Sequence, residues 1–309
     1  MRSSALTANA APDRRGFEMG RRKKPATTHG IAVVDKPSGV TSHDVVAMLR
    51  KRFDERQVGH GGTLDPSATG VLVVAVGKAT KLLRFVEKTR KAYVGEIVFG
   101  SETNTLDADG EVIATYEMGE VSLPDAQALV NEHLLGAIEQ IPPMVSAIKI
   151  DGKRLHELAR EGIEIERPPR PVTIYSFMLM ATDEPNVMLA AVECTPGTYI
   201  RTLAADLGHL LGGGAHLRNL RRTAVGRFTL AESGSPDECV LLPVEDAVRT
   251  LDRIDITEKL DDFVANGRVL PAWDGEGPWA LFRPDGTLSA VYERHGSIEA
   301  KPMVVVPPG

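Results

Sequence analysis

Apolar residues along the chain fall into short runs that predict strands and helices. Near-continuous apolar stretches at 30–35 and 70–76 predict two buried strands. Between them, apolar residues recur at helical spacing over 42–53, and Ser42 is expected to cap this helix. Residues 91–100 alternate with a period of two, which predicts a strand with Tyr93 on its buried face. The N-terminal third therefore predicts a sheet that carries at least one helix.

The rest of the chain mixes helix and strand patterns without a regular order. A basic amphipathic pattern predicts a helix over 79–86, and Ser122 and Gly136 are placed to begin and end another. Further strands are predicted at 146–150, 172–179 and 187–194, and further helices at 155–160 and 202–211. Because neither an internal repeat nor strict strand–helix alternation is present, we predict an α/β fold of the α+β type, with a mixed, largely antiparallel sheet flanked by helices.

Composition divides the chain into three parts. Residues 1–28 mix Ser, Ala and Pro with a basic run and have no hydrophobic period, so they predict a disordered basic arm. Residues 29–235 hold the interleaved strands and helices, whereas 240–309 has short apolar runs punctuated by Gly and Pro that predict a small β-rich domain. The net charge of -6 is uneven, with +2 over 1–228 and -8 over 229–309.

Two basic clusters interrupt the otherwise balanced charge of the large part. Residues 78–91 carry six Lys or Arg against one Glu, and 201–227 carry five Arg against one Asp. Such clusters can contact a phosphate backbone, although a solvated helix face is the commoner explanation for a charge run taken alone.

Cysteine and hydrophobic content narrow the class of protein. Cys194 and Cys239 lie far apart without the CxxC or His spacing of a zinc site, so we expect two reduced thiols and no metal. No apolar run approaches the roughly 18 residues of a membrane span, and the start of the chain lacks a secretory signal. We therefore expect a cytoplasmic protein without membrane contact.

The most unusual stretch is glycine-rich and covers 59–70. Four of its twelve residues are Gly, a density that permits close approach of the backbone to a ligand. It presents His60 and Asp65 from a loop between the predicted helix and the buried strand at 70–76. An isolated Asp-Pro pair usually only starts a turn, so the chemistry of Asp65 depends on its context.

That context resembles the TruB family, the tRNA pseudouridine-55 synthases. The family surrounds its catalytic aspartate with GTLDP followed by ATG, as found here at 62–70. Five further motifs occur in the family's order: DKPSGVTS at 35–42, KAY at 91–93, TLDADG at 105–110, QIPPMVSA at 140–147 and CTPGTYIRT at 194–202. The resemblance covers about 29–228 and implies a pseudouridine synthase fold, followed by a PUA-like domain over 240–309.

The resemblance implies the conversion of uridine 55 to pseudouridine in the T loop of tRNA, by a monomer that needs no cofactor and no metal. Asp65 would be the catalytic carboxylate, Arg201 the cation that pairs with it, and Tyr93 the tyrosine that stacks on the base and transfers a proton at C5. His60 would fill the stack vacated by the flipped base. The remaining substrate-binding residues implied are Lys36, Gly61, Gly62, Asp107 and Tyr199.

The sequence departs from the family at a few positions and leaves two alternatives open. Gly61, Ser67 and His156 stand where relatives often have other residues, but no reactive group is lost. The first alternative is an RNA chaperone that folds the T arm without catalysis. The second is a nucleotide or glycoside enzyme with a carboxylate pair, which would need a second acid close to Asp65 in space.

Overall fold

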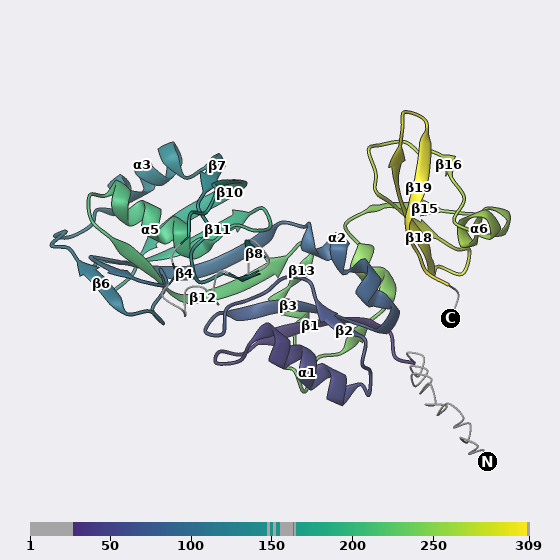
Figure 1. Cartoon of the computed structure of the whole chain (residues 1–309), viewed down its shortest axis with the longest axis horizontal. Helices are drawn as coiled ribbons and strands as arrows, with labels where there is room; N and C mark the ends of the chain where they lie inside the picture. The colour runs from purple at the N-terminus through teal and green to yellow at the C-terminus, as the bar shows by residue number, and fades with distance from the viewer. Residues whose placement is uncertain (1–26, 147–148, 151–152, 155–162, 164, 308–309) are drawn as a thin grey trace, which may run out of the picture.

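The computed structural model describes residues 27–146, 149–150, 153–154, 163 and 165–307 (Figure 1). Nearly all of the arm predicted over 1–28 and the whole helix predicted over 155–160 lie outside the described residues. Of the strand predicted over 146–150, the structure describes β8 (Lys149–Ile150), which pairs with β9 (Lys153–Arg154).

A ten-stranded sheet organises the large part of the molecule, in the order β14-β1-β3-β12-β4-β11-β10-β7, with β2 beside β3 and β13 beside β12. Only the β12–β3 pair is parallel among the strand pairs described in this sheet, so the predicted mixed, largely antiparallel architecture is confirmed. Its strands are β1 (Gly30–Lys36), β2 (Val58–His60), β3 (Thr69–Val76), β4 (Lys91–Phe99), β7 (Gly136–Gln140), β10 (Arg170–Ala181), β11 (Val187–Cys194), β12 (Ala215–Val225), β13 (Phe228–Thr229) and β14 (Leu241–Leu242).

The helix predicted over 42–53 is α1 (Ser42–Arg52), but its N-cap differs by one residue from the prediction. Thr41 rather than Ser42 is the N-cap, because the Thr41 hydroxyl accepts from the Asp44 N–H while the Asp44 carboxylate accepts from the Thr41 N–H. Ser42 is buried, and its hydroxyl accepts a hydrogen bond from the Leu64 N–H at 2.9 Å. The expected cap therefore holds the loop that carries Asp65.

The basic segment after β3 is not one helix. It forms the 3-10 helix η1 (Gly77–Leu82), followed by the short α-helix α2 (Leu83–Glu87). The next strand, β4, follows the predicted alternation throughout, with buried and half-buried residues in strict turn.

Two helices cover one face of the large sheet around the main core. They are α3 (Leu123–His133), capped by Ser122 as predicted, and α5 (Ile200–Leu210). Residues of both helices pack with Ile97, Phe177 and Leu217 of the sheet in one apolar cluster. Figure 1 shows α3 and α5 together over the β10–β11–β4 region. This packing fixes the first turn of α5, where Arg201 lies.

A second, five-stranded sheet forms the C-terminal unit, which Figure 1 shows as a curled yellow sheet beside α2. Its order is β15-β17-β18-β19-β16, with strands β15 (Asp252–Asp255), β16 (Leu270–Pro271), β17 (Trp279–Phe282), β18 (Leu288–His295) and β19 (Glu299–Val305) and the helix α6 (Glu258–Ala265). Because β14 pairs with β1, Leu241 and Leu242 belong to the large sheet, although they lie within the range 240–309 predicted for the small domain.

The remaining short elements are β5 (Ser101–Thr103), β6 (Val112–Thr115), η2 (Leu230–Glu232) and η3 (Val244–Val248). Within the described ranges, no helix is both long and apolar enough to cross a membrane.

Candidate active site

Asp65 lies on the loop between β2 and β3, and two polar side chains hold this loop from below. The Lys36 ammonium is fully buried and donates to the carbonyls of Pro37, Val40 and Pro66, the last at 3.0 Å. Burial lowers the pKa of Lys36 to about 8, although the nearby Asp65 carboxylate opposes this change. Lys36 therefore fixes the backbone on the C-terminal side of Asp65, and Ser42 fixes it on the N-terminal side.

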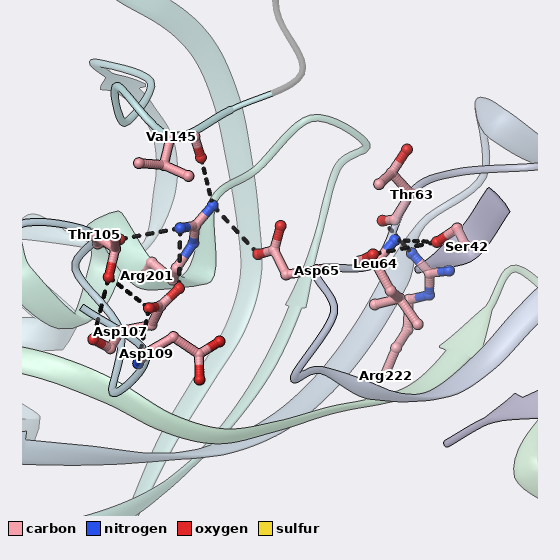
Figure 2. A network of polar contacts seen from close by, with 10 residues as sticks. All are labelled: Ser42, Thr63, Leu64, Asp65, Thr105, Asp107, Asp109, Val145, Arg201 and Arg222. Carbon is pink, nitrogen blue, oxygen red and sulfur yellow. Dashed lines mark hydrogen bonds and ion pairs between the residues drawn. The ribbon is translucent and has the colours of Figure 1, made fainter. Parts of the chain in front are cut away.

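Arg201 pairs with Asp65, as the resemblance implies, and it also pairs with a second carboxylate (Figure 2). Its side chain is buried, and its Nη2 lies 3.2 Å from Asp65 Oδ2 while its Nη1 lies 3.0 Å from Asp107 Oδ2. The same guanidinium donates to the carbonyls of Thr105 and Val145. Apart from Asp65, three acceptors from two separate segments thus hold Arg201, so its orientation does not depend on Asp65 alone.

The carboxyl group of Asp65 sits in a recess. Its side chain is 42% exposed, yet the surrounding protein removes enough water to raise the pKa of Asp65 above its ordinary value. Arg201 opposes that rise, whereas Asp107 and Asp109 add to it. Desolvation is the largest of these effects, so the surrounding protein disfavours the ionised form of Asp65 and Arg201 compensates only in part.

Tyr93 faces the same recess from β4 and is buried. Burial raises the pKa of its hydroxyl, and the positive charge of the nearby Arg222 partly offsets that rise. Tyr93 is therefore a neutral phenol at neutral pH, next to a guanidinium that was not among the predicted site residues.

These side chains line a cleft of about 300 Å³, near the lower end of the range for small-molecule sites. Tyr199 lines it beside Asp65, Tyr93 and Arg201, and its backbone is held by Gln140, which bonds both the N–H and the carbonyl of Tyr199. Asp107 instead lines an adjoining cleft of about 230 Å³ on the other side of the Asp65–Arg201 pair.

His60 lies at the end of β2, outside the lining of both clefts. Its ring packs edge-on against His43, with centroids 5.4 Å apart, and its Nδ1 is buried without a hydrogen-bond partner among the described residues. Burial lowers the pKa of His60 to about 4, so the ring is neutral at pH 7.

Of the two predicted glycines, only Gly62 lines the cleft, and its φ of 124° lies outside the range that side chains favour. A Cβ on Gly61 would lie 3.0 Å from Val86 Cγ1, so this position is closely packed.

Arg222 and Lys91 are the site residues that were not predicted as such. Arg222 is 1% exposed, and Lys91 is buried with its ammonium on the carbonyls of Glu87 and Thr89. Both line the cleft. Burial lowers the pKa of Lys91 to about 8, and Arg222 adds to this effect. The sequence carried one signal for a buried Arg at this position. Arg221 and Arg222 are adjacent, and consecutive residues of a strand point to opposite faces, so the two side chains of a strand there cannot share one exposed face.

The two basic clusters of the sequence differ in whether their charges are paired within the protein. In 201–227 every Arg has a protein partner. Arg201 and Arg222 are buried and hydrogen-bonded, as described above. The other three are partly or fully exposed: Arg218 pairs with Glu96 and Glu184, Arg221 pairs with Asp35, and Arg227 donates to a carbonyl. In 78–91, by contrast, Lys81, Arg84 and Lys88 are exposed, and no carboxylate of the described chain pairs with them. We call these three residues the basic strip.

Groups of three or more His, Cys, Asp or Glu side chains arranged to hold a metal ion do not occur among the described residues.

The sequence matches two family models. The TruB family pseudouridylate synthase N-terminal domain matches residues 50–200, and the tRNA pseudouridylate synthase B C-terminal domain matches residues 201–265. A tRNA pseudouridine synthase B of Geobacillus thermodenitrificans is 40% identical over 298 residues, covering 90% of this chain and 98% of the relative. One of Rhodococcus jostii is 42% identical over 304 residues, covering 94% and 99%.

Among solved structures, a chain of a Cbf5–Nop10–Gar1 complex superimposes with a TM-score of 0.69 at 25% identity, covering 89% of this chain and 84% of the other. A chain of an H/ACA ribonucleoprotein bound to a substrate RNA has a TM-score of 0.68 at 24% identity and covers 90% of this chain and 85% of its own.

Proposed function

Because the chain belongs to the TruB family of pseudouridylate synthases, we propose that it isomerises uridine 55 in the T loop of tRNA, with Asp65 as the catalytic carboxylate. The broader activity follows from the family: relatives at 40–42% identity are tRNA pseudouridine synthases, so the protein is an isomerase that acts on tRNA. In this reaction the bond from C1' to N1 breaks, the uracil rotates, and its C5 joins C1'. No atom is gained or lost, and no redox change occurs.

The observation that carries the proposal is the arrangement of Asp65 with Arg201 and Tyr93 around one cleft. Arg201 favours the ionised form of Asp65 against desolvation, which is what a carboxylate needs in order to act on the sugar or the base. Tyr93 presents an aromatic ring and a neutral hydroxyl to the same space. A uracil between them would be stacked, and its polar edge would be within reach of the hydroxyl.

The target base must leave its stack to enter this cleft, which costs a few kcal/mol. We infer that His60, neutral and wedged against His43, fills the space that the base vacates. Lys36 and Gly62 would support the Asp65 loop during this step, and Asp107 would keep Arg201 in place.

The basic strip is the best candidate for the contact with tRNA phosphates, since its charges are exposed and uncompensated. Its last residue, Lys88, directly follows Glu87, which lines the cleft, so an RNA backbone bound to the strip would run past the entrance. The C-terminal unit would contact the RNA as a PUA-like domain, by shape more than by charge, because 229–309 carries a charge of -8.

The test is pseudouridine formation on an unmodified T stem-loop transcript, comparing the wild type with Asp65→Asn and measuring RNA binding in parallel. Asp109→Asn is the matched control, because Asp109 is an exposed carboxylate near Asp65 that makes no contact with Arg201. We expect Asp65→Asn to bind RNA without converting it and Asp109→Asn to remain active.

A second transcript carries cytidine at position 55 and keeps every other uridine. Pseudouridine formed in this transcript would contradict the choice of uridine 55. A wild-type protein that binds the stem-loop but never converts uridine would favour the RNA chaperone.

A further inference from the structure

Arg222 occupies a position in the centre of the large sheet that ties the two halves of the active site together. In the β12–β4 ladder it stands directly opposite Tyr93, and in the parallel β12–β3 ladder it stands opposite Gly70. Tyr93 is the aromatic residue of the cleft, and Gly70 follows the loop that carries Asp65. Figure 2 shows Arg222 and Arg201 on opposite sides of Asp65.

The hydrogen bonds of Arg222 go to the loop that carries Asp65 and to the strand that follows it. Its Nη2 donates to the Gly62 carbonyl at 3.1 Å, its Nη1 to the Thr63 carbonyl at 3.3 Å, and its Nε to the Val71 carbonyl at 2.7 Å. Tyr93 stands across the β12–β4 ladder from this guanidinium, whose positive charge lowers the pKa of the Tyr93 hydroxyl and so opposes the effect of burial. The donors of one planar group therefore hold the backbone on both sides of Asp65, and the same group stands opposite the tyrosine that faces this loop.

Burying the Arg222 charge in this way is unfavourable in free energy. Arg222 is 1% exposed, and no carboxylate in the described part of the chain lies within ion-pair distance of it. A buried cation without an anionic partner is unfavourable unless its hydrogen bonds compensate, and an apolar residue would usually serve stability better. The neighbouring Arg221 shows the ordinary solution, since it is partly exposed and pairs with Asp35.

We propose that Arg222 is a positioning residue that fixes the Tyr93 hydroxyl relative to the Asp65 loop. A guanidinium has a positive charge and donors only, so the Tyr93 oxygen rather than its proton turns toward Arg222, and the hydroxyl proton is left to point elsewhere. Tyr93 lines the cleft, and the base is the polar group that would meet this proton there. The same group holds the carbonyls of Gly62 and Thr63, so the phenol and the carboxylate keep a constant separation while the base turns between them. This inference rests on the proposed function.

The test is a double-mutant cycle in full-length protein, measured as the single-turnover rate of pseudouridine formation at saturating enzyme. The variants are Arg222→Lys, Tyr93→Phe and the pair, with Arg221→Lys as the matched control on the opposite face of β12. Arg222→Lys keeps the charge but loses the planar fork. We expect it to slow the chemical step about 100-fold while leaving RNA affinity unchanged, because small misplacements of reacting groups have effects of this size.

The cycle separates a role through Tyr93 from general support of the fold. If Arg222 acts through Tyr93, the double variant is about as slow as Tyr93→Phe alone, since the two changes remove one interaction. Fully additive losses, a rate equal to that of Arg221→Lys, or an Arg222→Lys protein that does not fold would each overturn the proposal. A wild type that binds RNA but forms no pseudouridine would instead refute the proposed function.

Discussion

Gly70 offers a direct test of how closely the strands around the site are packed. Its φ is 99°, and a Cβ built on it would lie 2.1 Å from the carbonyl oxygen of Arg222 and 2.9 Å from the Arg222 nitrogen. These atoms belong to the backbone of β12, so no side-chain rotation can relieve the overlap. Gly70→Ala therefore requires β3 and β12 to move apart where they are joined in parallel.

Gly39 is the matched control for this change. Its φ is 84°, and a Cβ there would have no neighbour within 4 Å, so Gly39→Ala carries only the cost of the left-handed backbone. That cost is about 1–2 kcal/mol of unfolding free energy. Gly70→Ala should add an overpacking cost of about 1–3 kcal/mol. The difference between the two variants measures the contact between the strands.

The measurement is urea unfolding of both variants, combined with single-turnover pseudouridine formation under conditions where each remains folded. We expect Gly70→Ala to lose more stability than Gly39→Ala and also to react more slowly, because displacing Arg222 disturbs the groups that it holds. Equal losses of stability in the two variants would refute the reasoning, since they would mean that β12 can move away from β3 without any loss of unfolding free energy.

Two further predictions concern charge. Because the folded-state pKa of Asp65 is raised, the folded protein binds this proton more tightly than the unfolded chain, and the wild type loses stability as pH rises from about 4 through that pKa. The unfolding free energy of Asp65→Asn should therefore increase relative to that of the wild type between pH 4 and 7. A difference between the two proteins that does not change with pH would contradict the raised pKa. Replacing Lys81, Arg84 and Lys88 by Ala should weaken tRNA binding and reduce the slope of log affinity against log salt by about 2–3, whereas an unchanged slope would exclude the basic strip from the phosphate contact.

Much of the sheet could be predicted from the sequence because its strands follow simple patterns. The apolar run of β3 and the strict alternation of β4 are local signals, and the structure confirms both. The largest omission was β12, which carries four polar residues among 218–222. These residues are accommodated by partners distant in sequence, such as Glu96 and Asp35, and no local pattern reveals such pairs.

The site was predicted in part for the same reason. The pairing of Arg201 with Asp65 was expected from the resemblance to the family, and the structure brings the two together at 3.2 Å. Two other features of the site were not predicted: Asp107 shares the same guanidinium, and Ser42 holds the loop rather than capping a helix. Both depend on contacts between residues far apart in the chain. The adjacent residues Arg221 and Arg222 look equivalent in sequence, but the pleat of β12 sends one to an ion pair and the other into the core.

The distribution of cations around Asp65 explains how the carboxylate can be held in place and still react. Arg201, Lys36 and Arg222 are buried cations around its loop, but of these only Arg201 contacts the carboxylate, and Arg201 is shared with Asp107. Lys36 and Arg222 direct their hydrogen bonds to backbone carbonyls instead. If all three bonded the carboxylate, they would stabilise its charge strongly and reduce its reactivity. By fixing the loop rather than the carboxylate, they provide the precise position that catalysis requires and leave one oxygen of Asp65 open to the cleft.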